Sequence, residues 1–424
     1  MKLYSIHFLF TIITLTQHQL VSKEILIENV KILDVSKNSF SNNKKIYVEN
    51  GKITRIEESK SEKGKFLTPS FCDASVSFGY NSLGGVNSKE KAKLSARAFV
   101  AHGFTHVGSV TDLEYVNEIK KEIESGHIIG PEIISQKKPI LFLTKEYPEL
   151  PEKFYSIVKS EEEMKKEVEK QAKEGIKYIR IYHRYYEENL IHASSFLLFT
   201  LDNIAKRYGS RILVNTFADN ISLLEATRAG VQFVESPVVT ENLNFKEENF
   251  KEIRFIPYFG IYRNLMLSNY PDKMKKEFQR INSLDNFFKF NYANEAFESI
   301  KETQTEESQI LDNEEVMRFW EKFPYSGERM ILGSGSGHLY NFPGTSGIQE
   351  LELIYESFQK KINIWKIASR NSCELLGRVG HEKIELGNEF NAILYNNNPL
   401  NSISELYRPE QVFFKGKLVF NNSK

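Results

Sequence analysis

The feature that most constrains this chain is a series of short apolar segments, separated by longer amphipathic ones, that begins at residue 66. The short segments are rich in β-branched and aromatic residues, as buried strands are, and the longer ones have the apolar spacing of helices. Repeated strand-then-helix units predict a parallel sheet with helices outside it, and this many units predict a closed barrel. The predicted strands are 67–76, 105–110, 178–182, 212–216, 233–235, 254–260 and 330–332, and the predicted helices are 89–101, 113–125, 161–175, 194–208 and 222–229, with two more in 346–377.

The two ends of the chain instead alternate apolar and polar residues, as half-buried strands do. Asn50-Gly51 is a strong hairpin signal between two of these segments. Because the termini of a domain often meet, we expect the last strands to complete the first sheet. The alternating segments are 24–34, 45–49, 52–57, 389–394 and 410–419. The predicted domains are a composite β domain of 23–66 plus 380–424 and a barrel of 67–379 with a helical elaboration at 262–328.

The N-terminus has the pattern of an export signal. Lys2 provides a positive start, residues 3–16 are mostly apolar, and a polar stretch ends at Ser22, where cleavage would leave a mature chain without a transmembrane helix. An uncleaved N-terminal anchor is the alternative. We therefore predict a signal peptide at 1–22 and a periplasmic or extracellular protein. The 56 basic and 56 acidic residues leave a net charge of +0, which gives no indication of nucleic acid binding.

Several segments, in the right order, resemble the motifs of one family. Residues 67–77, LTPSFCDASVS, resemble the opening L-P-G-L-I-D-A-H-V-H of the amidohydrolases, and 229–236, AGVQFVES, resemble A-G-V-D-S-I-E-H. Residues 332–336, LGSGS, resemble L-G-T-D-S, and 368–371, 375–377 and 384–387 follow the closing run of the family. The chain thus resembles the amidohydrolase superfamily, in its imidazolonepropionase-like and prolidase-like subgroup. This resemblance implies a (β/α)8 TIM-type barrel inserted in a small β-sandwich formed by both chain ends.

The resemblance also implies a hydrolase site with one or two divalent metals at the carboxyl ends of the barrel strands. The positions that hold the metal ligands and the catalytic Asp in the family correspond here to Ser75 and Ser77, Arg180, Asn215 (or Phe217), Ser236 and Gly335. Neutral hydroxyls and amides are poor zinc ligands, an arginine cannot be deprotonated to become a ligand, and a glycine cannot carry a proton. The substitutions predict a pseudoenzyme with no metal or other cofactor and with a binding or structural role.

A relocated metal site is the enzymatic alternative. His183 and His338 follow two of the substituted positions, and Asp73 and Glu235 remain as carboxylates at strand ends. These four side chains could hold zinc or another divalent metal in a hydrolase of C–N bonds, dipeptides included. Ordinary loop positions are the simpler interpretation of both histidines.

Two other chemical readings are weaker. A serine hydrolase built on Ser75, Ser77 or Ser236 lacks a G-x-S-x-G elbow. A phosphate loop at 333–337 lacks both the full glycine spacing and a lysine.

Arg180 suggests what replaces the metal, because a buried arginine needs a partner. Asp73 is the first candidate for that partner and Glu235 the second. The alternative is a pocket in which Arg180, Ser75, Ser77 and Asn215 bind a small anionic molecule, since a guanidinium and hydroxyls suit a carboxylate.

The two cysteines raise a separate expectation. Cys72 precedes Asp73, which is expected to point inward, so Cys72 faces the helix layer, where Cys373 is expected. An exported protein could join them in a disulfide, and two buried free cysteines are the alternative. Structural roles are expected for His102 and His106, and an oligomer is compatible with the family.

Overall fold

The computed structural model describes residues 24–111, 113–143, 154–183, 193–217, 219–236, 251–300, 324–358 and 361–422. The predicted signal peptide lies outside these ranges, as does part of the predicted helical elaboration. Within them, no helix has the length and apolar character needed to cross a membrane.

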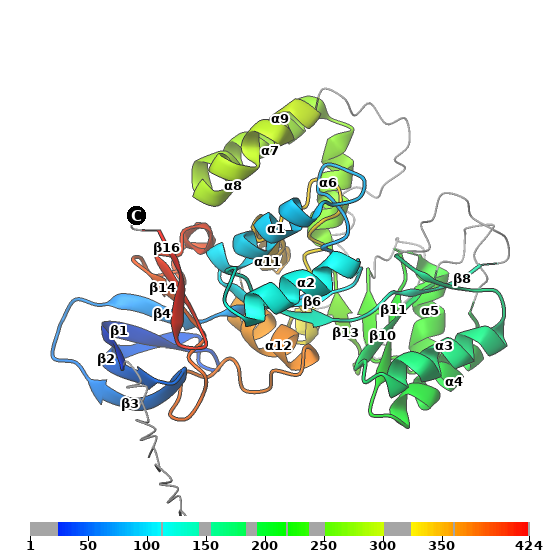
Figure 1. Cartoon of the computed structure of the whole chain (residues 1–424), viewed down its shortest axis with the longest axis horizontal. Helices are drawn as coiled ribbons and strands as arrows, with labels where there is room; N and C mark the ends of the chain where they lie inside the picture. The colour runs from blue at the N-terminus through cyan, green and yellow to red at the C-terminus, as the bar shows by residue number, and fades with distance from the viewer. Residues whose placement is uncertain are drawn as a thin grey trace, which may run out of the picture.

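Both ends of the chain contribute to one seven-stranded sheet with the order β16-β15-β14-β4-β1-β2-β3. Its strands are β1 (Ile25–Asp34), β2 (Ser39–Glu49), β3 (Lys52–Glu58), β4 (Lys65–Pro69), β14 (Ala392–Tyr395), β15 (Gln411–Phe414) and β16 (Lys417–Asn421). The two halves meet where β4 pairs antiparallel with β14, with Leu67 opposite Leu394. Figure 1 places this sheet at one end of the molecule, with the N-terminal strands beside the C-terminal ones. The second sheet of the predicted sandwich stays a prediction.

One strand prediction near the C-terminus was wrong in its extent. Residues 410–419 alternate in polarity, but the structure divides them into β15 and β16, which pair with each other. Lys415 and Gly416 form the turn, with φ of 49° and 75°. Two consecutive positive φ angles match the right-handed twist of a hairpin, and a Lys-Gly pair is a much weaker turn signal than Asn-Gly.

The α/β part of the molecule contains parallel strands in two sheets, of the orders β13-β12-β11-β10-β8-β9 and β5-β6-β7. The strands are β5 (Phe71–Val76), β6 (Phe104–Ser109), β7 (Glu132–Ser135), β8 (Ile140–Phe142), β9 (Ser156–Val158), β10 (Tyr178–Tyr182), β11 (Arg211–Asn215), β12 (Phe233–Glu235) and β13 (Arg254–Ile256). Segment 330–336 lies between the sheets: Met330 pairs with Phe255 of β13, and Ser336 pairs with Val76 of β5. The fold is therefore mixed α/β, with β13 and β5 joined through that segment.

Helices follow most of these strands, and short polar side chains set where several of them begin. Ser88, Ser160, Ser194 and Asp219 each accept a hydrogen bond from a backbone N–H in the first turn of α1, α3, α4 and α5, as N-cap residues do. The helices are α1 (Lys89–Ala101), α2 (Glu114–Glu124), α3 (Glu161–Lys173), α4 (Ser195–Lys206), α5 (Asn220–Arg228), α11 (Thr345–Ser357), the π-helix η3 (Lys366–Asn371), α12 (Ser372–Leu375) and the short 3-10 helix η4 (Ile403–Tyr407).

A further helical layer lies next to α1 and α11 (Figure 1). It consists of α6 (Phe259–Ser268), α7 (Pro271–Leu284), α8 (Asn286–Asn291) and α9 (Ala293–Ser299), and the 3-10 helix η2 (Pro324–Arg329) follows later in the chain. Phe278 and Phe288 from this layer pack against Phe342 with ring centroids 5.9 and 5.2 Å apart. The described part of the predicted elaboration is thus helical and has a core of its own.

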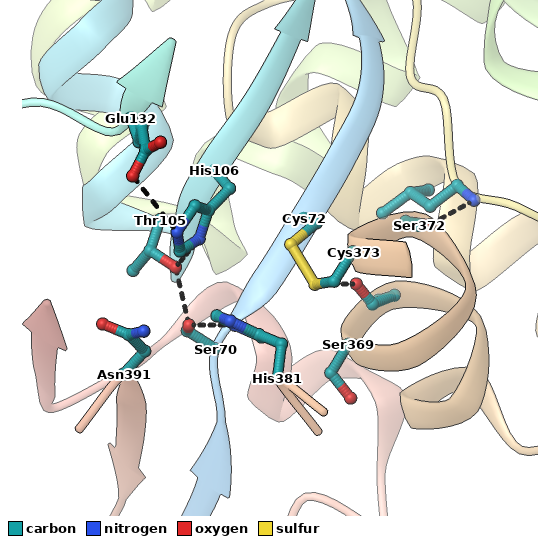
Figure 2. The surroundings of a disulfide bond; sticks show 12 residues. Ser70, Cys72, Thr105, His106, Glu132, Ser369, Ser372, Cys373, His381 and Asn391 are labelled. Atoms are coloured by element: carbon teal, nitrogen blue, oxygen red, sulfur yellow. Dashed lines mark hydrogen bonds and ion pairs between the residues drawn. A yellow bond between two sulfur atoms is a disulfide. The ribbon is translucent and has the colours of Figure 1, made fainter. Parts of the chain in front are cut away.

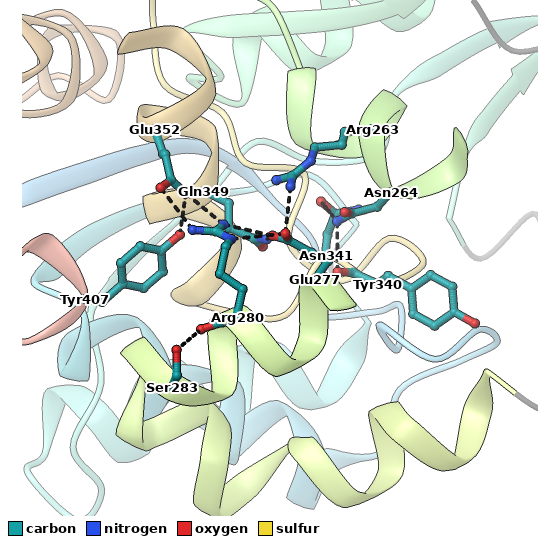
Figure 3. A network of polar contacts seen from close by, with 10 residues as sticks. All are labelled: Arg263, Asn264, Glu277, Arg280, Ser283, Tyr340, Asn341, Gln349, Glu352 and Tyr407. Carbon is teal, nitrogen blue, oxygen red and sulfur yellow. Dashed lines mark hydrogen bonds and ion pairs between the residues drawn. The ribbon is translucent and has the colours of Figure 1, made fainter. Parts of the chain in front are cut away.

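Charged side chains fix α7 to the core, as Figure 3 shows. Glu277 accepts hydrogen bonds from Arg263 at 2.7 Å and from Gln349 at 3.0 Å. Arg280 reaches Glu352 of α11 at 2.9 Å, and Tyr407 donates to the same carboxylate. This network holds the helical layer against both α11 and the C-terminal part of the chain.

Candidate functional site

The candidate site lies where the parallel strands β5, β10, β11 and β12 end. Side chains of paired residues in neighbouring parallel strands point to the same face of a sheet. Asn215 is paired with Glu235, and Arg180 is paired with Leu213, two residues before Asn215. Arg180, Asn215 and Glu235 therefore share one face, with Arg180 one layer deeper. All three are at most 6% exposed.

Glu235 is the centre of the contacts in this site. Its Oε1 accepts from Arg180 Nε at 2.8 Å and Nη2 at 2.5 Å, and from the hydroxyl of Tyr258 at 2.9 Å. Its Oε2 accepts from Asn215 Nδ2 at 3.3 Å. Both carboxylate oxygens are engaged, so Glu235 has an internal partner for its charge.

Arg180 is likewise enclosed by acceptors. Nη1 donates to the side-chain oxygen of Gln136, and Nη2 also approaches the carbonyl oxygen of Ala74 at 3.4 Å. Burial alone would lower the pKa of Arg180, but the neighbouring Glu235 carboxylate outweighs it and raises the pKa above its usual value. The guanidinium is charged at every accessible pH.

The partner of Arg180 is thus Glu235, the second of the two predicted candidates. Asp73, the first candidate, accepts instead from the backbone N–H groups of Ser75 and Ser334, at 3.2 and 3.0 Å, through Oδ1. Its Oδ2 has no hydrogen-bond partner among the described residues. Burial raises the pKa of Asp73 to about 7. The two amides favour the charged carboxylate and lower the pKa, but burial outweighs them and favours the protonated acid.

The remaining positions of the predicted site have separate partners. Ser75 shares a hydrogen bond of 2.5 Å with the hydroxyl of Tyr258, which links it to Glu235. Ser77 bonds the hydroxyl of Thr111, and Ser236 bonds that of Tyr262. Gly335 has φ of 61° and takes its backbone N–H to the carbonyl oxygen of Ser75.

Three strands are followed by residues that have a positive φ angle although they are not glycine. Phe217, Ser236 and Tyr258 follow β11, β12 and β13 and have φ of 46°, 59° and 56°. Positive φ at residues other than glycine is uncommon and gathers at functional sites. At Tyr258 the turn brings the phenol back over Glu235 and begins α6.

The histidines of the alternative metal site are placed differently from each other. His183 is buried just after β10, and its backbone N–H donates to the carbonyl oxygen of Asn215 at 2.9 Å. His338 is half-buried and stacks on Tyr80 with ring centroids 5.9 Å apart. Burial lowers the pKa of His338. Of the four predicted ligands, Glu235 is already bound by Arg180 and Asp73 by backbone amides.

A second buried acid lies close to Asp73, and it was not predicted. Glu350 of α11 accepts from the N–H groups of Phe259 and Gly260 at 3.0 and 2.6 Å, at the start of α6. Burial raises the pKa of Glu350 to about 8, and the neighbouring Asp73 adds to that rise. A hydroxyl chain from Ser334 through Ser336 to Ser346, with links of 2.7 Å, runs between these segments.

The donor set does not fit the metal centre that the family resemblance implies. A divalent ion there needs several imidazole or carboxylate donors around one point. Among the described residues, the centre of the candidate site holds one carboxylate, that of Glu235. Its oxygens accept hydrogen bonds from three side chains, those of Arg180, Tyr258 and Asn215. A cation would have to displace a guanidinium that is fixed in place.

The sequence interpretation missed Tyr258 and Gln136. Tyr258 lay inside the strand predicted at 254–260, so the sequence pattern gave no sign that β13 ends at Ile256 and that Tyr258 turns back over the site. Gln136 comes directly after β7 (Glu132–Ser135), a strand that the sequence pattern did not reveal.

The disulfide and His102 are not part of this site. Cys72 and Cys373 are joined in a disulfide with their Cα atoms 5.2 Å apart, between β5 and α12. His102 bonds Asp285 at 2.8 Å and holds α1 to the start of α8.

Comparisons with known proteins agree with this architecture. No family model and no curated protein matches the chain. Among solved structures, a Xaa-Pro dipeptidase with bound methionine in the active site is 18% identical with a TM-score of 0.69, over 93% of this chain and 99% of that one. A putative prolidase from Bifidobacterium longum is 17% identical with a TM-score of 0.68, over 94% of each chain.

A. niger ochratoxinase is also similar, at 15% identity and a TM-score of 0.67, over 95% of this chain and 96% of that one. An amidohydrolase structure matches at 16% identity with the same TM-score and 95% of this chain covered. At such identities the likeness speaks for the fold. The chain therefore has the fold of the amidohydrolase and prolidase structures, in agreement with the fold that the sequence resemblance implies.

Proposed function

We propose that this chain is a catalytically degenerate amidohydrolase-like protein whose former metal position now has a structural role. The proposal assigns Ser75, Ser77, Arg180, Asn215 and Ser236 to the positions of metal ligands and Gly335 to that of the catalytic acid. It takes the eight-stranded barrel as the framework, with segment 330–336 as the last strand between β13 and β5.

The observation that carries the proposal is the pairing of Arg180 with Glu235. An unpaired charge in this environment would cost several kcal/mol, so the guanidinium and the carboxylate each need the other. Together they put an ion pair with no net charge in the place of a metal cation and its ligand. Asn215 and Tyr258 complete the contacts of the carboxylate.

A hydrolysis screen tests the loss of catalysis. The substrates are Xaa-Pro dipeptides, N-acyl amino acids and cyclic amides, each with and without added Zn²⁺, Mn²⁺ or Co²⁺, and an active prolidase serves as the positive control. We expect no rate above the uncatalysed one with any metal. Metal-dependent turnover that Glu235→Gln abolishes would contradict the proposal.

A structural role is favoured over the binding of a small anion. The Nε and Nη2 atoms of Arg180 that would hold a carboxylate already contact Glu235, and Nη1 contacts Gln136. A thermal shift screen with small carboxylic acids separates the two roles. We expect no shift. A shift that is lost in Asn215→Ser would assign the binding role instead.

The hydrolase with relocated ligands is the second candidate, and the unpartnered Oδ2 of Asp73 favours it. The similar structures include a Xaa-Pro dipeptidase and a prolidase, so C–N bonds are the substrate class that this candidate takes. Its test is zinc binding that depends on Asp73, His183 and His338. Unchanged zinc affinity in the three single alanine variants would eliminate it.

The proposal includes export. The support is the sequence pattern of residues 1–22, with its positive start and apolar run. N-terminal sequencing of protein recovered from its native compartment gives the test. A mature chain that starts near Lys23 is expected, and one that starts at Met1 would contradict a cleaved signal.

A further inference from the structure

The disulfide lies beside two histidines, and none of these residues belongs to the candidate site described above. Figure 2 shows Cys72, His106 and His381 around one place, with the bond to Cys373 on the side of α12. One donor atom from each of Cys72, His106 and His381 lies within 4.8 Å of the other two. If the bond to Cys373 were broken, the Cys72 thiolate and the two imidazoles would face each other.

The two imidazoles are held in position by a chain of hydroxyl groups. The Ser70 hydroxyl contacts His381 Nε2 at 2.9 Å and the Thr105 hydroxyl at 2.7 Å, and Thr105 contacts His106 Nδ1 at 3.0 Å. His106 Nε2 lies 3.7 Å from a Glu132 oxygen. Oxygen partners on the rings of ligating histidines are the usual means by which proteins orient them for a metal.

The cluster is enclosed, and His381 is its most exposed member. Cys72 and Cys373 are fully buried and His106 is 1% exposed, whereas His381 is half-buried. His381 comes from the connection between α12 and β14, so the cluster joins β5, β6 and that connection. A metal would enter on the His381 side.

We propose that reduction of the Cys72–Cys373 disulfide creates a site for zinc or a similar divalent transition metal, with Cys72, His106 and His381 as ligands and Cys373 as the fourth. Tetrahedral zinc with sulfur and nitrogen ligands needs donors about 3.5 Å apart. The freed Cys72 sulfur can turn toward the imidazoles, and the Cys373 sulfur starts one bond away from it. The disulfide and the metal ion are thus alternative cross-links between β5 and α12.

The chemistry of the step balances with a phosphine as reductant. The phosphine gives two electrons to the disulfide, the S–S bond breaks, and water supplies the oxygen of the phosphine oxide and one proton to each sulfur. The metal ion then displaces both thiol protons as it binds. In an oxidising compartment the disulfide persists, whereas before oxidation the thiols are available to metal.

Cobalt binding tests the proposal. The full chain is reduced with a phosphine, freed of it by anaerobic gel filtration, and titrated with Co²⁺. We expect one Co²⁺ per chain, with the visible bands of tetrahedral cobalt and a near-ultraviolet thiolate-to-cobalt charge-transfer band. The oxidised chain should show neither, because its sulfurs are not thiolates.

Three variants make the assignment specific. His381→Asn should weaken Co²⁺ binding by at least about tenfold, whereas His127→Asn, at an exposed histidine, is the matched control and should not. Cys373→Ser frees Cys72 without any reductant, and it should still show charge transfer from one thiolate. It therefore keeps the test open if the reduced wild-type chain unfolds.

Two results would overturn the proposal. One is the absence of the charge-transfer band from both the reduced wild-type chain and Cys373→Ser. The other is equal Co²⁺ affinity in His381→Asn and His127→Asn, which would place the metal elsewhere.

Discussion

Arg180 donates from both Nε and Nη2 to a single oxygen of Glu235, and neither side chain is more than 1% exposed. A guanidinium that is fixed in this way supplies a permanent positive charge inside the α/β core. Removal of one member of a buried pair leaves the other uncompensated, which distinguishes it from a surface ion pair.

The first prediction concerns that pair. Arg180→Met should lower the free energy of unfolding by about 3–5 kcal/mol, since it leaves the Glu235 side chain buried without its main partner. Denaturant unfolding gives the measurement. Lys166→Met is the control, because its pair with Glu162 is mostly exposed and should contribute under about 1 kcal/mol.

The double variant Arg180→Met with Glu235→Leu should recover most of that loss, because no charge is left buried. A double variant as unstable as Arg180→Met alone would show that the charge pairing is not what the single substitution disturbs. The same unfolding experiment gives this comparison.

The second prediction is a fall in stability with rising pH. The pKa of Asp73 is raised by burial from 3.8 to about 7, and that of Glu350 from 4.5 to about 8. The folded chain therefore holds more protons than the unfolded chain between about pH 4 and pH 8. Stability from these groups is fully present below about pH 4 and is lost as the pH rises through both folded values.

Asp73→Asn removes one of the two groups from this dependence. A pKa shift of this size changes the free energy of unfolding by at most roughly 4 kcal/mol over the whole pH range. Thermal melts from pH 5 to pH 8.5 should thus fall less steeply in the variant than in the wild-type chain. Parallel curves would show that Asp73 is ionised in the folded chain at the lower end of this range.

The third prediction concerns the contact of α1 with the helical layer. Asp285 caps α8 through Phe288 N at 3.0 Å and also accepts from His102 and Thr345. Its charge outweighs burial and raises the pKa of His102. Asp285→Ala should cost about 2–4 kcal/mol, as a helix cap and a buried partner are lost together.

Hydrogen exchange locates that effect. We expect α7 and α8 to lose protection before β10 and β11 do, because the contact joins the helical layer to α1. Equal loss in all four elements would mean that the layer does not open separately.

The fourth prediction concerns the disulfide. Thiol counting on denatured, unreduced protein should give no free thiol, and two after reduction. Because the bond closes a loop over a sequence separation of 301 residues, its reduction should lower stability by about 2–4 kcal/mol. Two free thiols before reduction would contradict the bond.

The elements with clear periodicity were predictable from the sequence. The bounds of α1, β10 and β12 agree with the predicted 89–101, 178–182 and 233–235, since each has a strong apolar pattern and recognisable ends. β7, β8 and β9 were not predicted, because three or four residues are too few for a period to appear. The strand predicted at 254–260 stops at Ile256, since the left-handed Tyr258 begins α6.

The members of the candidate site that lie at motif positions were predictable from the sequence, but Tyr258 and Gln136 and the contacts between the members were not. The register of β11 and β12 brings Asn215 beside Glu235, as motifs at successive strand ends suggested. Arg180 pairs with Glu235 and not with Asp73 for two reasons. Asp73 accepts hydrogen bonds from two backbone N–H groups, and the turn at Tyr258 brings its hydroxyl to Glu235. Such contacts come from loop geometry, which sequence spacing does not encode.

Metal analysis tests the central claim most directly. The oxidised protein, purified without chelators and without a metal-binding tag, is measured by plasma mass spectrometry after dialysis. We predict no transition metal in proportion to the protein, because Arg180 occupies the place of the cation beside Glu235 and the thiols are closed. One or more tightly held zinc ions per chain, lost in Glu235→Gln, would contradict this account.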